Sequence, residues 1–328
     1  MPPSAPSPSP RQRRVGFAGR VFACAIGLAL LGAAIWGVSR DPQVTARLWH
    51  DLPGWPWWAG VLLFALPCVN WLLTGAVFFT LTKARARVSW LEMTALVGAG
   101  WVLNFFPLSP GLFARVAYQR SRHGLSLRTS TRIIIESIAL GWISVGLVLP
   151  ALLLAVRSSR GPWAPGLWAS LCVLLAILAL GACGRWPGTA RELGTMYCRA
   201  LALKAADLLV WTARYALVFH LAGTPISWPA ALGVALVAQM AMLVPLIGNG
   251  LGIREWAVGL LVGVLPAVST ASGLGADLLN RAGELGAAIP VGLACAAWLA
   301  HHHHTRPDPA RGPSPIKTLP EPASQADP

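Results

Sequence analysis

Long apolar runs, separated by short polar connections, fill this chain from residue 18 to residue 299. A helix needs roughly 20 mainly apolar residues to cross the hydrocarbon core of a bilayer. None of the polar stretches between the runs is long enough for a soluble catalytic domain. The sequence therefore predicts an all-α fold, a bundle of transmembrane helices, with membrane segments at 18–38, 57–81, 88–112, 133–156, 163–183, 205–222, 229–247, 254–270 and 275–299.

The charged residues indicate which partners to expect. They make up only 12% of the chain, about half the share that is usual in soluble domains, yet the formal net charge is +14. The arginines form short clusters between apolar runs, whereas a nucleic-acid-binding domain carries a basic stripe on one surface. We therefore expect contact with membrane lipid, in particular with anionic headgroups, and no nucleic acid partner.

Lysine and arginine are unevenly distributed between the two sides that these segments define. Nineteen lie in the tails and connections on the side of the N-terminus, against four on the other side. Cytoplasmic connections are enriched in these residues, so both termini are predicted to be cytoplasmic, with the protein in the cytoplasmic membrane. Residues 1–14 and 301–328 are Pro-rich and are predicted to be disordered tails around a membrane domain of residues 15–300.

The segment 88–112 does not fit this alternation, because both of its flanks are basic. It ends in NFFPLSPG (Asn104 to Gly111), where Pro107 and Pro110 each remove a backbone donor that a helix needs. Broken backbone at membrane depth is tolerated only where protein or a water-filled cavity satisfies it. We therefore predict that 88–112 is a re-entrant segment and that about eight other segments span the membrane.

A second break resembles the first. PLSPGLFAR, from Pro107, and PLIGNGLGIR, from Pro245, both run from Pro-Leu through a Gly-containing break to an arginine, 138 to 139 residues apart. Paired breaks in two halves of a transporter point to its substrate site, so we predict an internal repeat, although two short matches can also arise by chance. The predicted break residues are Asn104, Pro107, Gly111, Pro245, Gly248, Asn249, Gly250 and Gly252.

Ionisable residues inside apolar runs are the candidates for function, because each is costly there unless it is paired or hydrated. The predicted substrate-binding cations are Arg115, Arg214, Arg254 and Arg281. The carboxylates predicted to couple protons or to form ion pairs are Glu136, Asp207, Glu255 and Glu284. Lys204, Asp207 and Arg214 are expected on one helix face, with Arg214 near the membrane midplane.

Purely structural alternatives remain open for three of these groups. Glu136 could form a helix-edge ion pair with Arg132, four residues earlier, and Glu255 could cap the helix that follows GNGLG. Asp277, Arg281 and Glu284 form an acid–base–acid stripe, which could be a neutral structural network or a substrate path.

Motifs of soluble enzymes are missing from the sequence: it has no Walker A loop, HExxH motif or DxD pair. We predict no catalytic residue, metal site or cofactor. The four consecutive histidines, His301 to His304, are interpreted as a solvated run beside the membrane and not as a metal site.

Two stretches resemble the signatures of a known family. NFFPLSPGLFARVAYQRSRHGLS, with Glu136 behind it, and VPLIGNGLGIRE, followed by Arg281 and Pro290, are similar to those of the lysylphosphatidylglycerol synthase transmembrane-region family. Its members are flippase-like membrane proteins. The first stretch departs from the family at Ser137, where arginine is usual, and at 112–114, where glycine and an acid are usual. The resemblance covers residues 15–300 and does not include a soluble aminoacyltransferase domain.

The resemblance implies movement of an anionic or polyprenyl-linked lipid across the bilayer. For such a transporter we expect a hydrated groove between the two breaks. Arg115, Arg214 and Arg254 would hold the headgroup phosphate in that groove. Two other functions stay open at this point. One is an intramembrane transferase that uses a lipid-linked donor, and the other is a non-transporting subunit of an envelope assembly.

Overall fold

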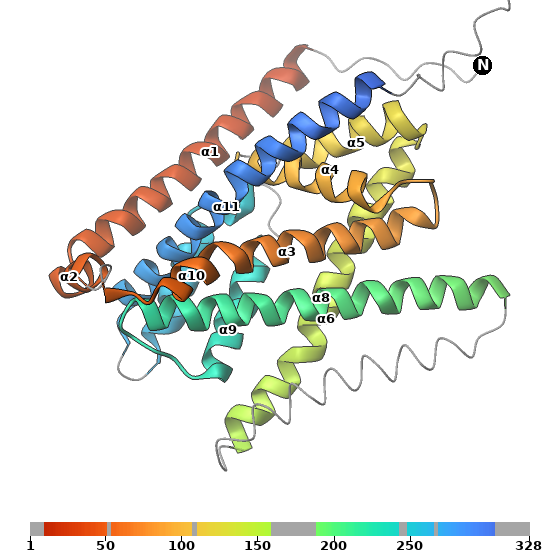
Figure 1. The fold of residues 1–328 in the computed structure, drawn as a ribbon. Helices are drawn as coiled ribbons and strands as arrows, with labels where there is room; N and C mark the ends of the chain where they lie inside the picture. Colours follow the sequence, from red (N-terminus) through yellow and green to blue (C-terminus); the bar gives the residue numbers. More distant parts are fainter. Residues whose placement is uncertain are drawn as a thin grey trace, which may run out of the picture.

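A computed structural model describes residues 10–50, 54–106, 110–158, 188–242, 248–265 and 268–305. These ranges are all-helical (Figure 1). The helices are α1 (Pro10–Ser39), α2 (Pro42–His50), α3 (Trp57–Lys83), α4 (Trp90–Leu103), α5 (Pro110–His123), α6 (Leu127–Ser158), α8 (Gly188–Leu221), α9 (Trp228–Met242), the one-turn 3-10 helix η2 (Gly248–Gly250), α10 (Ile253–Gly263) and α11 (Thr270–Thr305).

Three described helices are long and apolar enough to cross a membrane: α3, α6 over Leu127–Val148 and α11 over Thr270–His302. They indicate a membrane protein. The prediction of about eight spans is not confirmed within the described residues, and the segment predicted at 163–183 lies outside them. α4 and α9 are apolar but have only 14 and 15 residues. At 1.5 Å per residue each reaches about 21–23 Å, short of the roughly 30 Å hydrocarbon core.

The two helices α4 and α5 form a hairpin, called the first hairpin below. The side chain of Ser89 caps α4 by accepting a hydrogen bond from the backbone N–H of Glu92. Near the tip, Gly111 packs so closely on Gly100 that a Cβ atom would overlap the carbonyl oxygen of Gly100. At the base, His123 of α5 lies 3.0 Å from Glu92 of α4. The chain has therefore returned, by the end of α5, to the level at which α4 began.

The first hairpin extends beyond the predicted re-entrant segment, which ended at residue 112. Its returning arm α5 continues to His123 and includes arginine, glutamine and serine. A search for apolar residues cannot recognise such a helix as part of the hairpin. Pro107, predicted as a break residue, falls between the described ranges.

The helices α9 and α10 form the second hairpin. Its tip contains η2 and the turn into α10, and here Asn249, Gly250 and Gly252 have positive φ angles of 50°, 66° and 80°. Glycine adopts this left-handed conformation without the penalty that a Cβ atom brings. Gly252 also packs on Gly27 and Leu30 of α1, with no room for a side chain. The sequence predicted two spans here, at 229–247 and 254–270, but α10 has only 11 residues. Pro245 lies outside the described residues.

The same order of helices occurs twice along the chain. A long helix, two short helices and another long helix follow one another as α3, α4, α5, α6 and again as α8, α9, α10, α11. The start of α4 at residue 90 and the start of α9 at 228 are 138 residues apart. The starts of α6, at 127, and α11, at 270, are 143 residues apart. α4 packs on α11, and correspondingly α9 packs on α6.

The first long helices of these two series, α3 and α8, lie side by side and run in opposite directions (Figure 1). Ala59, near the start of α3, clusters with Leu221 at the end of α8. In the middle, Asn70 of α3 donates a hydrogen bond to Asp207 of α8. These two helices are therefore antiparallel along their contact.

The helix ends extend beyond the boundaries predicted for the two tails. α1 begins at Pro10, where proline's missing N–H costs a helix nothing. α11 continues through the four histidines to Thr305, shortly before Pro307, a residue type that commonly follows helix ends. The rest of the predicted tails, 1–9 and 306–328, lies outside the described residues.

Candidate functional site

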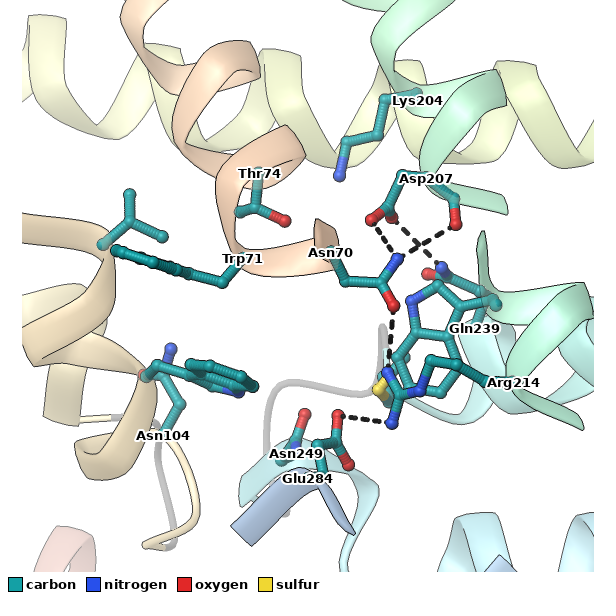
Figure 2. Close-up of a pocket in the computed structure, with 14 residues that line it drawn as sticks. Asn70, Trp71, Thr74, Asn104, Lys204, Asp207, Arg214, Gln239, Asn249 and Glu284 are labelled. Atoms are coloured by element: carbon teal, nitrogen blue, oxygen red, sulfur yellow. Dashed lines mark hydrogen bonds and ion pairs between the residues drawn. The ribbon is translucent and has the colours of Figure 1, made fainter. Parts of the chain in front are cut away.

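A polar cavity of about 180 Å³ lies between the two hairpins and the helices α3, α8 and α11. Figure 2 shows Asp207, Arg214 and Gln239 on one side of it and Trp71 and Asn104 on the other. At about 30 Å³ per molecule, this volume would hold roughly six waters. The cavity therefore has room for a small polar group inside an otherwise apolar bundle.

Each hairpin contributes an asparagine from its tip to this cavity. Asn104 directly follows α4, and Asn249 lies in η2. The side-chain atoms Oδ1 of Asn104 and Nδ2 of Asn249 are buried and have no hydrogen-bond partner in the structure. Since buried polar atoms are nearly always paired, both amides are available to water or to a polar ligand.

Asn70 of α3 connects two charged residues of α8 at the cavity wall. Its Nδ2 donates to Oδ1 of Asp207 at 2.7 Å, and its Oδ1 accepts from Nη1 of Arg214 at 3.1 Å. Gln239 of α9 donates a further bond to Asp207 at 3.3 Å. The predicted shared face of Lys204, Asp207 and Arg214 lines the cavity. Asn70 was missed because only ionisable residues were sought within apolar runs; an amide there is an equally informative signal.

Arg214 also contacts α11. It donates to Oδ1 of Asn280 at 2.8 and 3.1 Å and lies 3.5 Å from a carboxylate oxygen of Glu284. Its guanidinium stacks 4.0 Å from the ring centre of Trp211. This arginine is thus held by neutral groups and by one longer ion pair.

Arg254, in the first turn of α10, is fully buried and has two carboxylate partners. It lies 3.1 Å from Asp277 and 2.9 Å from Glu284, both in α11. The hydroxyl of Tyr215 donates to Asp277 at 2.7 Å. Two residues of the predicted stripe on α11 therefore neutralise Arg254.

The third residue of that stripe, Arg281, forms an ion pair with Glu255 of α10. It also donates to the backbone carbonyl of Asn249 at 3.4 Å, which connects the pair to the tip of the second hairpin. The ion pair therefore joins α10 to α11. Glu255 has this role in addition to any capping of α10.

The charges of this cluster balance. Its four cations are Lys204, Arg214, Arg254 and Arg281, and its four carboxylates are Asp207, Glu255, Asp277 and Glu284. Arg214 lines the cavity, whereas Arg254 and Arg281 lie behind its wall. With full ionisation the cluster carries no net charge, so a ligand anion would have to compete with a carboxylate for any of its arginines.

Glu136 lies in a different cluster. It accepts hydrogen bonds from Arg85 at 2.8 Å, from Arg132 at 2.9 Å and from Tyr197 at 2.9 Å. The helix-edge pair with Arg132, one of the two interpretations of the sequence, is present, and Glu136 does not line the cavity. Its bonds join α6 to the end of α3 and to α8.

Arg115 is also separate from the cavity, contrary to the predicted grouping with Arg214 and Arg254. It lies on α5, is 4% exposed and stacks 3.5 Å from the ring centre of Phe78. Its Nη2 atom has no hydrogen-bond partner. Among the described residues no carboxylate lies within 4 Å of it, so the two arginines that follow the two breaks have opposite environments.

No family model, no curated protein and no solved structure matches this chain.

Proposed function

We propose that this protein is a lipid transporter of the lysylphosphatidylglycerol synthase transmembrane-region type. It would move an anionic or polyprenyl-linked lipid across the cytoplasmic membrane. The observation that carries this proposal is the polar cavity to which the tips of both hairpins contribute an unpaired asparagine amide. Irregular backbone at membrane depth is found where it lines a water-filled cavity or a substrate site.

We infer further that the two series of helices form an inverted repeat. Equivalent helices of such repeats run antiparallel, as α3 and α8 do. The first hairpin would then enter from the cytoplasmic face and the second from the outer face. Six segments would span the membrane, with both termini cytoplasmic: α1, α3, α6, the segment predicted at 163–183, α8 and α11. This arrangement replaces the eight spans predicted from hydropathy and keeps the excess of cytoplasmic arginine.

The transport mechanism we propose places the lipid phosphate in the cavity and leaves the acyl chains in the bilayer. Arg214 is the arginine that faces the cavity, and its ion pair with Glu284 is longer than the pairs of Arg254. Protonation of Asp207, which is linked to Arg214 through Asn70, would loosen Arg214 so that it can bind a phosphate through its planar fork. The sequence has no Walker A loop, so a proton gradient or a partner would supply the energy.

Reconstitution into liposomes tests this proposal. Fluorescent lipids with anionic, zwitterionic and polyprenyl phosphate headgroups are placed in one leaflet, with and without a proton gradient, and their appearance in the other leaflet is measured. We expect movement of an anionic class, its loss in Arg214→Gln, and normal rates in Arg132→Gln, whose side chain is 69% exposed and does not line the cavity. If no lipid class moves under any gradient, the transport proposal is wrong and a transferase or accessory role is favoured.

A further inference from the structure

The buried face of α5 is polar. Gly111, Arg115 and Gln119, spaced four residues apart, face the protein interior, whereas Phe113 is 68% exposed. Residues four apart lie above one another on a helix surface. An amphipathic helix usually turns its apolar side toward the protein core. In α5 the polar side faces the protein interior instead. Hydrogen-bond donors therefore lie at positions that apolar side chains usually occupy.

Two of these buried donors have no partner. The atoms Nη2 of Arg115 and Nε2 of Gln119 make no hydrogen bond in the structure, and their residues are 4% and 2% exposed. Arginine remains protonated in proteins, so Arg115 is a buried cation, and Phe78 supplies only a ring face beneath it. The two unpaired donors lie on the same face of α5, one helical turn apart, and one is on a cation.

Arg115 and Gln119 lie along α5 between two hollows of the structure. Toward the tip of the hairpin, Gly111 packs beside Asn104, which lines the cavity. Toward the base, His123 lines a cleft of about 500 Å³ whose charged residues are Lys83, Arg87 and Arg122 and one acid, Glu92. From Gly111 to His123 the helix rises by about 18 Å. Arg115 and Gln119 therefore lie between a basic cleft and the cavity.

We propose that Arg115 and Gln119 form a binding site for one phosphate group, distinct from the cavity. The guanidinium fork would bind two phosphate oxygens, and the amide of Gln119 would donate to the third. Phe78 holds the guanidinium plane in place through the stacking contact. The proposal deepens the proposed function: a headgroup phosphate would stop here between the basic cleft and the cavity.

The site is tested by the melting temperature of the purified full-length protein in a maltoside detergent, which contains no phosphate. Three additions are compared: phosphatidylglycerol, diacylglycerol with the same acyl chains, and inorganic phosphate. The variant Arg115→Met keeps an unbranched side chain on Phe78 and removes the charge. The control, Arg254→Met, removes an equally buried arginine that has two carboxylate partners.

We expect phosphatidylglycerol, but not diacylglycerol, to raise the melting temperature of the wild type by several degrees. Arg115→Met should lose this increment, and Gln119→Met should reduce it. Without lipid, Arg115→Met should melt above the wild type, because an unpaired buried cation is removed, whereas Arg254→Met should melt below it. If Arg115 only stabilised the fold, Arg115→Met would not melt above the wild type in the absence of lipid.

Three results would overturn the site: a lower melting temperature of lipid-free Arg115→Met, an undiminished lipid increment in that variant, or an equal increment from diacylglycerol. If only inorganic phosphate raises the melting temperature, the site binds free phosphate and not a lipid headgroup. Binding and transport are measured separately here. A phosphate site in a protein that moves no lipid contradicts only the transport proposal, and transport without an Arg115-dependent increment contradicts only this site.

Discussion

Asn104 and Asn249 come from the tips of two different hairpins and line the same cavity, and each has a side-chain amide atom without a partner. They contribute little to holding the fold together, since Oδ1 of Asn104 and Nδ2 of Asn249 bind no other side chain. Their position suits a role in binding a polar group inside the cavity.

Replacing these asparagines should therefore affect transport more than stability. Asn249 has a φ angle of 50°, which glycine adopts freely, so Asn249→Gly removes the amide without straining the backbone. We expect Asn249→Gly and Asn104→Ala to change the free energy of unfolding by less than about 1 kcal/mol, as for positions without special contacts. Lipid movement in liposomes should fall at least tenfold. Unchanged transport rates in both variants would show that the amides do not contact the substrate.

The pair of Glu255 and Arg281 gives a prediction about stability. Both side chains are buried, and each is the other's charged partner. Removal of one partner from a buried ion pair typically costs about 3–5 kcal/mol, whereas replacement of both by apolar residues is often neutral. We expect Glu255→Leu and Arg281→Met to lower the melting temperature strongly and the double variant to recover most of the loss. Additive losses in the double variant would show that each residue has another essential contact.

The contact between Glu92 and His123 at the base of the first hairpin predicts a dependence on pH. Burial raises the pKa of Glu92, but hydrogen bonds from His123 and Tyr118 outweigh burial, so its pKa lies below the usual value. The ionised form is therefore favoured in the folded state. Its contribution is complete above about pH 4.3, the pKa of an unperturbed glutamate, and is lost as the pH falls through the lowered pKa.

The variant Glu92→Gln isolates this contribution. It should melt below the wild type at pH 7 by the equivalent of roughly 1 kcal/mol, the usual size of a partly exposed hydrogen-bonded charge contact. The difference should shrink between pH 5 and pH 3 as the wild type loses the ionised carboxylate. Melting curves of both proteins across this range are the measurement. A difference that is independent of pH would mean that Glu92 has the same pKa in the folded and the unfolded protein, so that its ionisation contributes nothing to stability.

The sequence indicated where the first break lies and which charged residues lie around the cavity, but not which partners these residues contact. The search for ionisable residues inside apolar runs selected Asp207, Arg214 and Glu284, and all three line the cavity, because such residues must face protein or water. The sequence could not show that Arg254 is neutralised by Asp277 whereas Arg115 is unpaired. Spacing along one helix gives the face of a residue, but its partners come from other helices.

Hydropathy was also a poor guide to the second hairpin. The residues of α9 and α10 are as apolar as those of a span. The glycines between them indicated a break, but hydropathy still predicted a full span on each side of it. In α5 the error was opposite: polar residues on the buried face concealed a helix of the hairpin. For α5, α9 and α10 the composition of the sequence was clear, but it did not indicate where each helix begins and ends.

The central claim, that two hairpins enter the membrane from opposite faces and meet at the cavity, is tested most directly by side-specific cysteine labelling. Single cysteines replace Ala84, Ser126, Ser227, Leu251 or Ser269 in a variant without the six native cysteines. An impermeant maleimide is then applied to right-side-out and to inverted membranes. The first two positions flank the first hairpin, Ser227 and Ser269 flank the second, and Leu251 lies at the tip of the second.

We predict labelling of Ala84→Cys and Ser126→Cys from the cytoplasmic side only, and of Ser227→Cys and Ser269→Cys from the outer side only. Leu251→Cys should react slowly from either side, because the tip is within the membrane. Two results would contradict the account: opposite sides for Ala84→Cys and Ser126→Cys, or labelling of Leu251→Cys from the cytoplasm as fast as that of Ser126→Cys.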